Sequence, residues 1–187
     1  MSPITHFLAG WALANTTKLD PRERMLVAVA GVIPDVDGFG IIVDLATRHA
    51  TDWWGRFHHE LGHNLGFCLL VTIVFTTLAK HKGRTALLVF LSFHLHLFCD
   101  IIGARGPDGD QWPIPYLEPF SHWPRLTWSG QWALNAWPNM LITGVLIALS
   151  VYWAWRRGYS PLEMFSRKAD AVFVDTLRKR IPIAPEI

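Results

Sequence analysis

Three long apolar segments constrain the fold of this chain more than any other feature. They occupy residues 64–79, 85–102 and 138–155, and each is a near-continuous run of aliphatic and aromatic side chains. A helix needs about 20 residues to cross a hydrocarbon core of roughly 30 Å, so runs of this kind are typical of membrane helices. The 187 residues fit one domain. We therefore expect an all-α, polytopic helical membrane bundle with about three longer membrane helices.

The composition supports a membrane protein and argues against a nucleic-acid binder. Apolar residues make up 51% of the chain and ten are Trp, which is typical of helices anchored at a membrane interface. The net charge of +2 is distributed over several short clusters. Since a nucleic-acid binder needs a continuous basic face, no nucleic-acid docking is expected.

The remaining segments complete the predicted architecture. Short helices are expected at residues 7–17 and 25–33, too short to span a bilayer alone. The Pro, Gly and Trp-rich segment 103–132 has no helical period and predicts an ordered loop that caps one end of the bundle. We expect residues 1–158 to form the membrane-embedded domain. Residues 159–187 form a basic amphipathic tail that is suited to an anionic membrane face.

Charge bias predicts the orientation. The basic stretches PRER, KHKGR and WRRG and the basic tail favour the cytoplasmic side, which places the C-terminus in the cytoplasm. The opposite ends of the predicted helices then meet on the non-cytoplasmic side and carry histidines and carboxylates. The residues that converge there are His6, Asp35, Asp37, His58, His59, His63, His96 and Asp100. Ionisable groups next to apolar runs are costly and usually functional.

The spacing of these residues indicates a metal site. His59 and His63 are four residues apart, as are His96 and Asp100, so each pair shares a face if its segment is helical. Two such pairs supply four nitrogen and oxygen ligands, a mixture that zinc accepts. The sequence thus predicts a bound divalent metal, with Zn²⁺ as the best match, and leaves the number of ions open.

Residues 59–63 also match the zinc-protease pattern H-E-x-x-H. In that interpretation His59, His63 and Asp100 bind zinc and Glu60 is the general base. The extended metzincin pattern requires a histidine at position 69, which is Leu69 here. An intramembrane metalloprotease therefore stays an alternative, as does a non-enzymatic membrane protein with a structural metal.

Five stretches resemble the YdjM-like family of predicted membrane-bound metal-dependent hydrolases: THFLAGWALA, IPDVDG, HHELGHN, HLHLFCDIIG and WPIPYLEPFSHW, between residue 5 and about residue 123. The family pattern falls on His6, Asp35, Asp37, His58, His63, His96 and Asp100. Asn64 stands where serine is usual and His59 where arginine is common. The resemblance leaves open whether His58 or His59 is the ligand.

The resemblance implies an activity and a location. The family is distantly similar to zinc-dependent phospholipase C, which implies hydrolysis of a phosphoester or lipid-linked substrate by a metal-activated water in a bacterial inner membrane. Asp37 or Glu60 would accept the proton. Membrane lipid is the expected partner, together with a small or lipid-like substrate. We expect five tryptophans to line or anchor the entrance: Trp112, Trp123, Trp128, Trp132 and Trp137.

Overall fold

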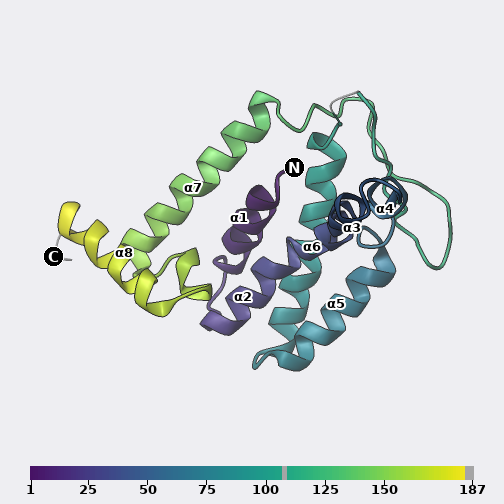
Figure 1. Cartoon of the computed structure of the whole chain (residues 1–187). Coiled ribbons are helices and arrows are strands. Elements are labelled where there is room, and N and C mark those ends of the chain that lie inside the picture. The colour runs from purple at the N-terminus through teal and green to yellow at the C-terminus, as the bar shows by residue number, and fades with distance from the viewer. Residues whose placement is uncertain (107–108, 184–187) are drawn as a thin grey trace.

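The computed structural model describes residues 1–106 and 109–183, and this part of the chain is helical (Figure 1). It contains eight α-helices and two 3₁₀-helices. Their bounds are α1 Pro3–Ala14, α2 Pro21–Ala30, η1 Ile33–Phe39, α3 Gly40–Ala46, α4 Trp53–Phe57, α5 Leu65–Leu78, α6 Lys82–Gly103, α7 Trp137–Arg157, η2 Pro161–Met164 and α8 Arg167–Arg180. Extended pairing among the described residues is confined to two isolated bridges, Arg105 with Ala133 and Ile114 with Leu126. The predicted all-α class is confirmed.

Two helices, α6 with 22 residues and α7 with 21, are long and apolar enough to cross a membrane. The third candidate span differs from the prediction. Helix α5 has only 14 residues, because Asn64 caps its first turn and the polar stretch after Leu78 ends it. A bent pair formed by residues 21–30 and 33–46, with an angle of 52°, passes the span test instead. The chain thus has two, or with the bent pair three, candidate spans.

The first two helices begin earlier than predicted. Helix α1 begins at Pro3, after the capping residue Ser2. Helix α2 begins at Pro21, because Asp20 and Glu23 form a reciprocal capping box. The basic stretch PRER is therefore the first turn of α2 and not a loop.

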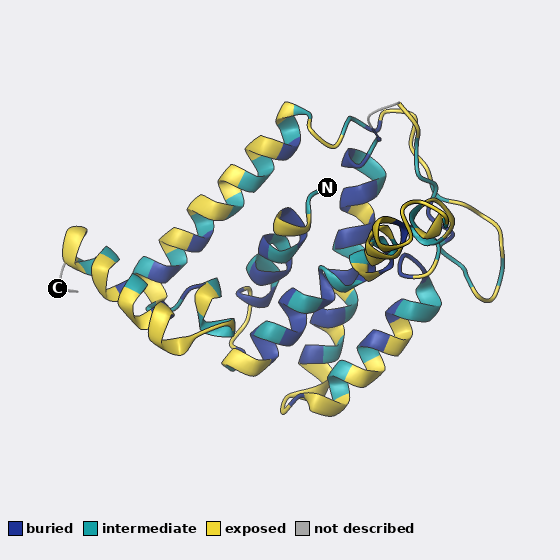
Figure 2. Cartoon of the chain, viewed as in Figure 1, coloured by how far each residue is buried: buried dark blue, intermediate teal, exposed yellow. Residues whose placement is uncertain are grey.

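Helices α1, α2 and α6 form the buried centre (Figure 2). Small residues allow their backbones to approach closely. A Cβ atom added to Gly10 of α1 would lie 2.8 Å from the hydroxyl oxygen of Ser92 and 3.1 Å from the backbone of Ala28. Helix α5 packs on α6, and α7 packs on α1. This close contact brings the ends of α1, α2 and α6 together at the end of the bundle where the candidate site lies.

A buried ion pair helps to attach the C-terminal segment to the bundle. Arg24 of α2 donates two hydrogen bonds to Glu163 of η2, at 2.6 and 2.8 Å. Its guanidinium also lies 4.0 Å from the centre of the Tyr159 ring. Helix α8 then follows with three basic residues in its last turn, which confirms the helix expected in the tail.

We predict that Gly10→Ala destabilises the protein, whereas Gly144→Ala does not. Gly144 lies on α7, and an added Cβ there would meet no atom within 4 Å. At Gly10 the same methyl group overpacks the contact with α2 and α6, which should lower the free energy of unfolding by about 1–3 kcal/mol. Thermal unfolding of the detergent-purified variants measures the difference. Equal stability of the two variants would contradict this packing.

Candidate metal centre

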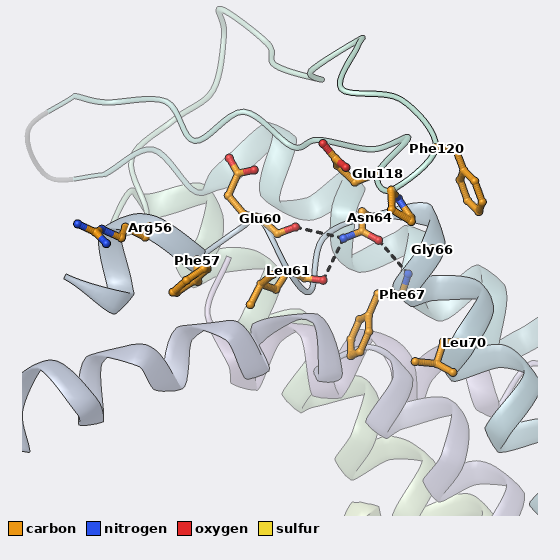
Figure 3. A pocket seen from close by; sticks show the side chains of 11 residues that line it. Arg56, Phe57, Glu60, Leu61, Asn64, Gly66, Phe67, Leu70, Glu118 and Phe120 are labelled. Atoms are coloured by element: carbon orange, nitrogen blue, oxygen red, sulfur yellow. Dashed lines mark hydrogen bonds between the residues drawn. The ribbon is translucent and has the colours of Figure 1, made fainter. Parts of the chain in front are cut away.

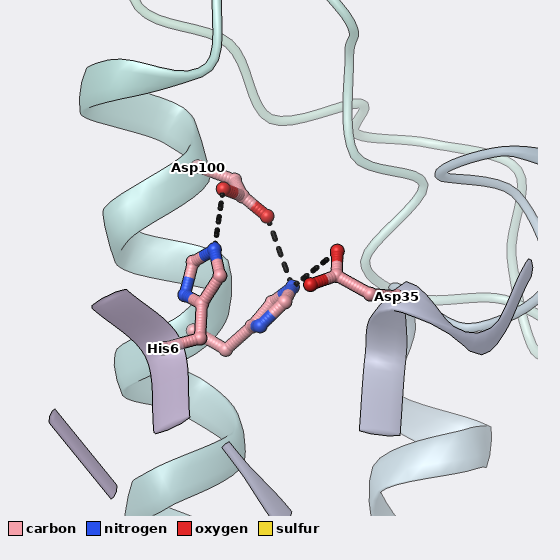
Figure 4. A group of neighbouring side chains, drawn as sticks. His6, Asp35 and Asp100 are labelled. Atoms are coloured by element: carbon pink, nitrogen blue, oxygen red, sulfur yellow. Dashed lines mark hydrogen bonds and ion pairs between the residues drawn. The ribbon is translucent and has the colours of Figure 1, made fainter. Parts of the chain in front are cut away.

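The histidines and carboxylates predicted to converge lie together at one end of the bundle, and Figure 4 shows His6, Asp35 and Asp100 of this set. They come from α1, from η1, from the loop 58–64 and from the last turns of α6. One group comprises His6, Asp35, His96 and Asp100, and a second comprises His59, His63 and Asp100. The ligand atoms within each group lie within 4.8 Å of one another. Asp100 belongs to both groups.

Helix α6 supplies the first pair of donors. His96 and Asp100 are one turn apart, and Nε2 of His96 lies 2.9 Å from Oδ2 of Asp100. On the other side of the ring, Nδ1 of His96 donates a hydrogen bond to the carbonyl of Gly31 at 2.9 Å. This bond assigns the proton to Nδ1, so Nε2 presents its lone pair to the centre of the cluster. The predicted shared face of His96 and Asp100 is confirmed.

His63 presents the second ring nitrogen. Its Nδ1 donates to Oδ2 of Asp37 at 3.1 Å. Its Nε2 lies 3.1 Å from Nε2 of His96 and 3.5 Å from Oδ2 of Asp100. Oδ1 of Asp35 lies 3.9 Å from the same nitrogen of His63 and 3.6 Å from that of His96.

Four atoms have the spacing of a metal's ligands: Nε2 of His63, Nε2 of His96, Oδ2 of Asp100 and Oδ1 of Asp35. Zinc bonds of about 2.0–2.1 Å in a tetrahedron put the ligand atoms about 3.3 Å apart. The five separations given above lie between 2.9 and 3.9 Å. The Nε2 atoms of His63 and His96 face each other, and the buried Oδ2 atoms of Asp35 and Asp100 have no hydrogen-bond partner. Since unpaired buried carboxylate oxygens are costly, the donor set fits a divalent cation.

Asp37 lies behind the histidines and holds them. Its Oδ1 accepts from Nδ1 of His58 at 3.1 Å, and its Oδ2 accepts from the backbone N–H of Gly62 at 2.9 Å as well as from His63. Both oxygens are therefore occupied. A carboxylate that accepts from the outer nitrogen of a ligand histidine orients that ring and increases its basicity.

His6 and His59 flank the central set. Nε2 of His6 lies 3.1 Å from Oδ1 of Asp100, which also contacts the amino group of Met1. His59 is buried against His63, with ring centroids 4.1 Å apart, and its Nδ1 has no partner. The sequence left His58 and His59 as alternatives. The structure places His59 in a ligand group and binds His58 to Asp37.

The H-E-x-x-H stretch is not helical in the structure, so the shared helical face of His59 and His63 does not form. Helix α4 ends at Phe57, and α5 begins only at Leu65. His59 has a left-handed backbone with φ of 66°. The loop turns tightly at Gly62, where an added Cβ would overlap the backbone carbonyl of Pro34. His59 and His63 therefore meet through a tight loop and not along one helical face.

Residues 1–165 match the family described as YdjM inner membrane protein. The chain belongs to this family. The match confirms the resemblance based on the sequence stretches, and the family description agrees with the two apolar spans. No curated protein matches the chain, and no solved structure matches it. The activity of this YdjM family member must therefore be argued from its own site.

Glu60, the predicted general base, is directed away from the cluster. Its carboxylate accepts two hydrogen bonds from Arg125, at 2.6 and 2.9 Å. It lines a separate cavity of about 700 Å³ beside Asn64 and Gly66 (Figure 3). Asn64 caps α5 by accepting from the N–H of Phe67, and its amide donates to the carbonyls of Glu60 and Leu61. Asn64 thus connects the loop to α5.

The predicted tryptophans separate into different environments. The Trp112 ring centroid lies 5.2 Å from that of His58 and 5.1 Å from that of His59, so this side chain covers the histidine loop. Trp132 donates to Asn139 and connects the loop to α7. Trp123, Trp128 and Trp137 are exposed. Sequence reasoning missed Trp54, which stacks on His58 at 3.9 Å, although its position four residues before His58 was a signal.

The two buried loop histidines have opposite electrostatic surroundings. Burial opposes the charged form of His63, but Asp100 and Asp37 outweigh it and raise its pKa to about 9. Burial and the neighbouring His63 lower the pKa of His59 well below its usual value. A metal that binds Nε2 of His63 must therefore displace a proton, whereas His59 is already neutral.

We predict that Asp37→Asn weakens metal binding by about 10- to 100-fold, because the substitution removes the charge that orients His63. Asp44 offers a matched control. It is similarly buried and accepts three hydrogen bonds, from Thr51 and from the N–H groups of Trp53 and Trp54, but belongs to neither ligand group. Asp44→Asn should leave the affinity unchanged. Competition with a zinc chelator measures both, and equal affinities would refute the role of Asp37.

Proposed function

We propose that this chain is a membrane-bound metal-dependent hydrolase that cleaves a phosphoester or lipid-linked ester by attack of water. One observation carries the proposal: four donor atoms on three separate segments, at the end of an apolar bundle, are 2.9 to 3.9 Å apart in the five pairs given above, as the ligands of a metal are. Such a set is expensive to bury without a cation, which is why it indicates a function.

In this proposal three donors among His63, His96, Asp100 and Asp35 would hold a divalent metal, which leaves a fourth position for water. His6 lies beside Asp100, and His59 lies beside His63. Zinc fits the donors best. When bound, the metal lowers the pKa of a coordinated water toward 7 and polarises the substrate ester. Asp100 is shared by both ligand groups.

The other polar groups position the donors and move the proton. Asp37 holds the ring of His63, and the Gly31 carbonyl holds that of His96. Asp37 has both oxygens in hydrogen bonds, and Glu60 is paired with Arg125. Asp35 keeps an oxygen, Oδ2, without a partner. We therefore assign the proton acceptor to Oδ2 of Asp35.

The location supports a lipid-like substrate. The cluster lies at the end of α6 opposite to Lys82 and Arg84, and α7 likewise ends in Arg156 and Arg157 on the far side. The positive-inside bias then assigns the site to the non-cytoplasmic side, with α8 on the cytoplasmic face. A site at the end of membrane helices is accessible to membrane lipids without their extraction into water.

We predict that His63→Ala and Asp100→Ala each abolish stable metal binding, whereas His94→Ala retains it. His94 is a matched control on the same helix, because its ring contacts the Phe90 carbonyl and the Tyr116 hydroxyl and not the cluster. Metal analysis of the detergent-purified proteins decides the question. A wild-type protein that neither contains nor rebinds a divalent metal would refute the proposal.

A second pair of variants distinguishes this hydrolase from the metalloprotease alternative. His6→Ala should weaken metal binding and abolish hydrolysis of a nitrophenyl phosphoester, since His6 contacts Asp100. Glu60→Gln should retain most of that activity, because Glu60 lies outside the cluster. The protease alternative makes the opposite prediction. Casein cleavage that requires Glu60 and not His6 would establish it in place of the hydrolase.

A further inference from the structure

A second cavity, of about 510 Å³, lies between the first two helices, η1 and the segment that follows α7. Its lining is apolar except for one carboxylate. The residues are Pro3, Phe7, Met25, Val29, Val32, Ile33, Asp35, Val36, Phe39, Met164 and Phe165. Its volume lies within the range of small-molecule sites, about 300–1,000 Å³.

The one carboxylate that lines this cavity, Asp35, is also a member of the metal cluster. It is the accessible member of the central donor set, since its side chain is 20% exposed, against 3% for Asp100 and 0% for His63 and His96. The cavity beside Glu60 is lined by none of these four. A ligand that reaches the cluster past Asp35 must therefore place its remaining atoms against the apolar wall.

The wall follows one face of the bent apolar pair. Met25 and Val29 are one turn apart on α2, and Val32, Val36 and Phe39 continue the lining past the bend to the site. Phe7 of α1 and Phe165 after η2 face each other with ring centroids 6.0 Å apart. Val36 and Phe39 are exposed apolar side chains on η1, which passes the span test together with α2 and α3. Phe165, which follows η2, is also exposed. The lining of the cavity thus runs from α2 to exposed apolar side chains on η1 and after η2.

We propose that this cavity binds the aliphatic chain of an amphiphilic substrate, whose polar ester then lies at Asp35 beside the metal. This inference rests on the proposed function, and it specifies the substrate as a lipid with at least one chain that enters from the bilayer. A polar chain would find no hydrogen-bonding partner among the lining residues apart from Asp35. The substrate would be selected by its chain as well as by its ester.

The test uses a series of alkyl phosphates from ethyl to octyl, below their aggregation concentrations. Their binding is measured to the full chain in phosphatidylcholine nanodiscs. Each methylene that enters the cavity should tighten binding by about fourfold. Val29→Trp fills the cavity and should remove this dependence on chain length. Val145→Trp, at an exposed position on α7, is the matched control. It should behave as the wild type, because the alkyl phosphates partition equally into the nanodisc lipid around either protein. Equal chain-length profiles for the two variants would overturn the proposal.

Two further measurements distinguish the cavity proposal from the proposed metal site. Phe165→Ala shortens an exposed residue of the cavity wall, and it should weaken octyl phosphate binding by about fivefold while ethyl phosphate binding is unchanged. Repeating the series after chelation separates the two proposals. Loss of ethyl phosphate binding on chelation supports the metal, and a chain-length dependence that survives chelation supports the cavity. If Val29→Trp removes the chain-length dependence and chelation changes no binding, the cavity proposal stands and the metal-dependent hydrolase is refuted. If chelation abolishes ethyl phosphate binding and Val29→Trp leaves the chain-length dependence unchanged, only the cavity proposal is refuted.

Discussion

This end of the molecule depends on the contacts between the Asp100 carboxylate and three histidines. The carboxylate is buried near the end of α6, and its oxygens contact ring nitrogens of His6, His63 and His96. These histidines come from three different segments of the chain. A buried charge of this kind is tolerated only where it is paired or coordinates a metal. Asp100 therefore requires α1 and the histidine loop to converge on α6.

The break between α2 and η1 is the second requirement. Gly31 ends α2, and its carbonyl accepts the hydrogen bond that orients His96. The chain then turns through Pro34, so that Asp35 is directed to the cluster while Asp37 holds His58 and His63. A straight helix could not place two carboxylates two residues apart on opposite sides of one histidine. The bend thus converts an apolar segment into part of a polar site, as non-helical backbone at membrane depth does where it lines a site.

The geometry also explains why the stretch at residues 59–63 resembles a protease pattern without forming its helix. In a zinc protease both histidines lie on one helical face, with the glutamate beside them. Here the loop between α4 and α5 presents His59 and His63 to the cluster and turns Glu60 toward Arg125. The H-E-x-x-H motif thus lies in a loop here and not on the helix of a zinc protease. The cluster instead draws its carboxylates from η1 and α6.

The sequence by itself determined the helical class, the two long spans α6 and α7, and the set of histidines and carboxylates that meet at one end. These features follow from local hydropathy, charge bias and the four-residue spacing of His96 and Asp100, which a continuous helix preserves. Only the tertiary structure decided which of those residues are central. His63 and His96 face each other because Asp37 and the Gly31 carbonyl hold their outer nitrogens, and these partners are distant in sequence. The separation of His58 from His59, the pairing of Glu60 with Arg125 and the apolar cavity at Asp35 depend on a tight loop and a bent helix, whose geometry no local pattern encodes.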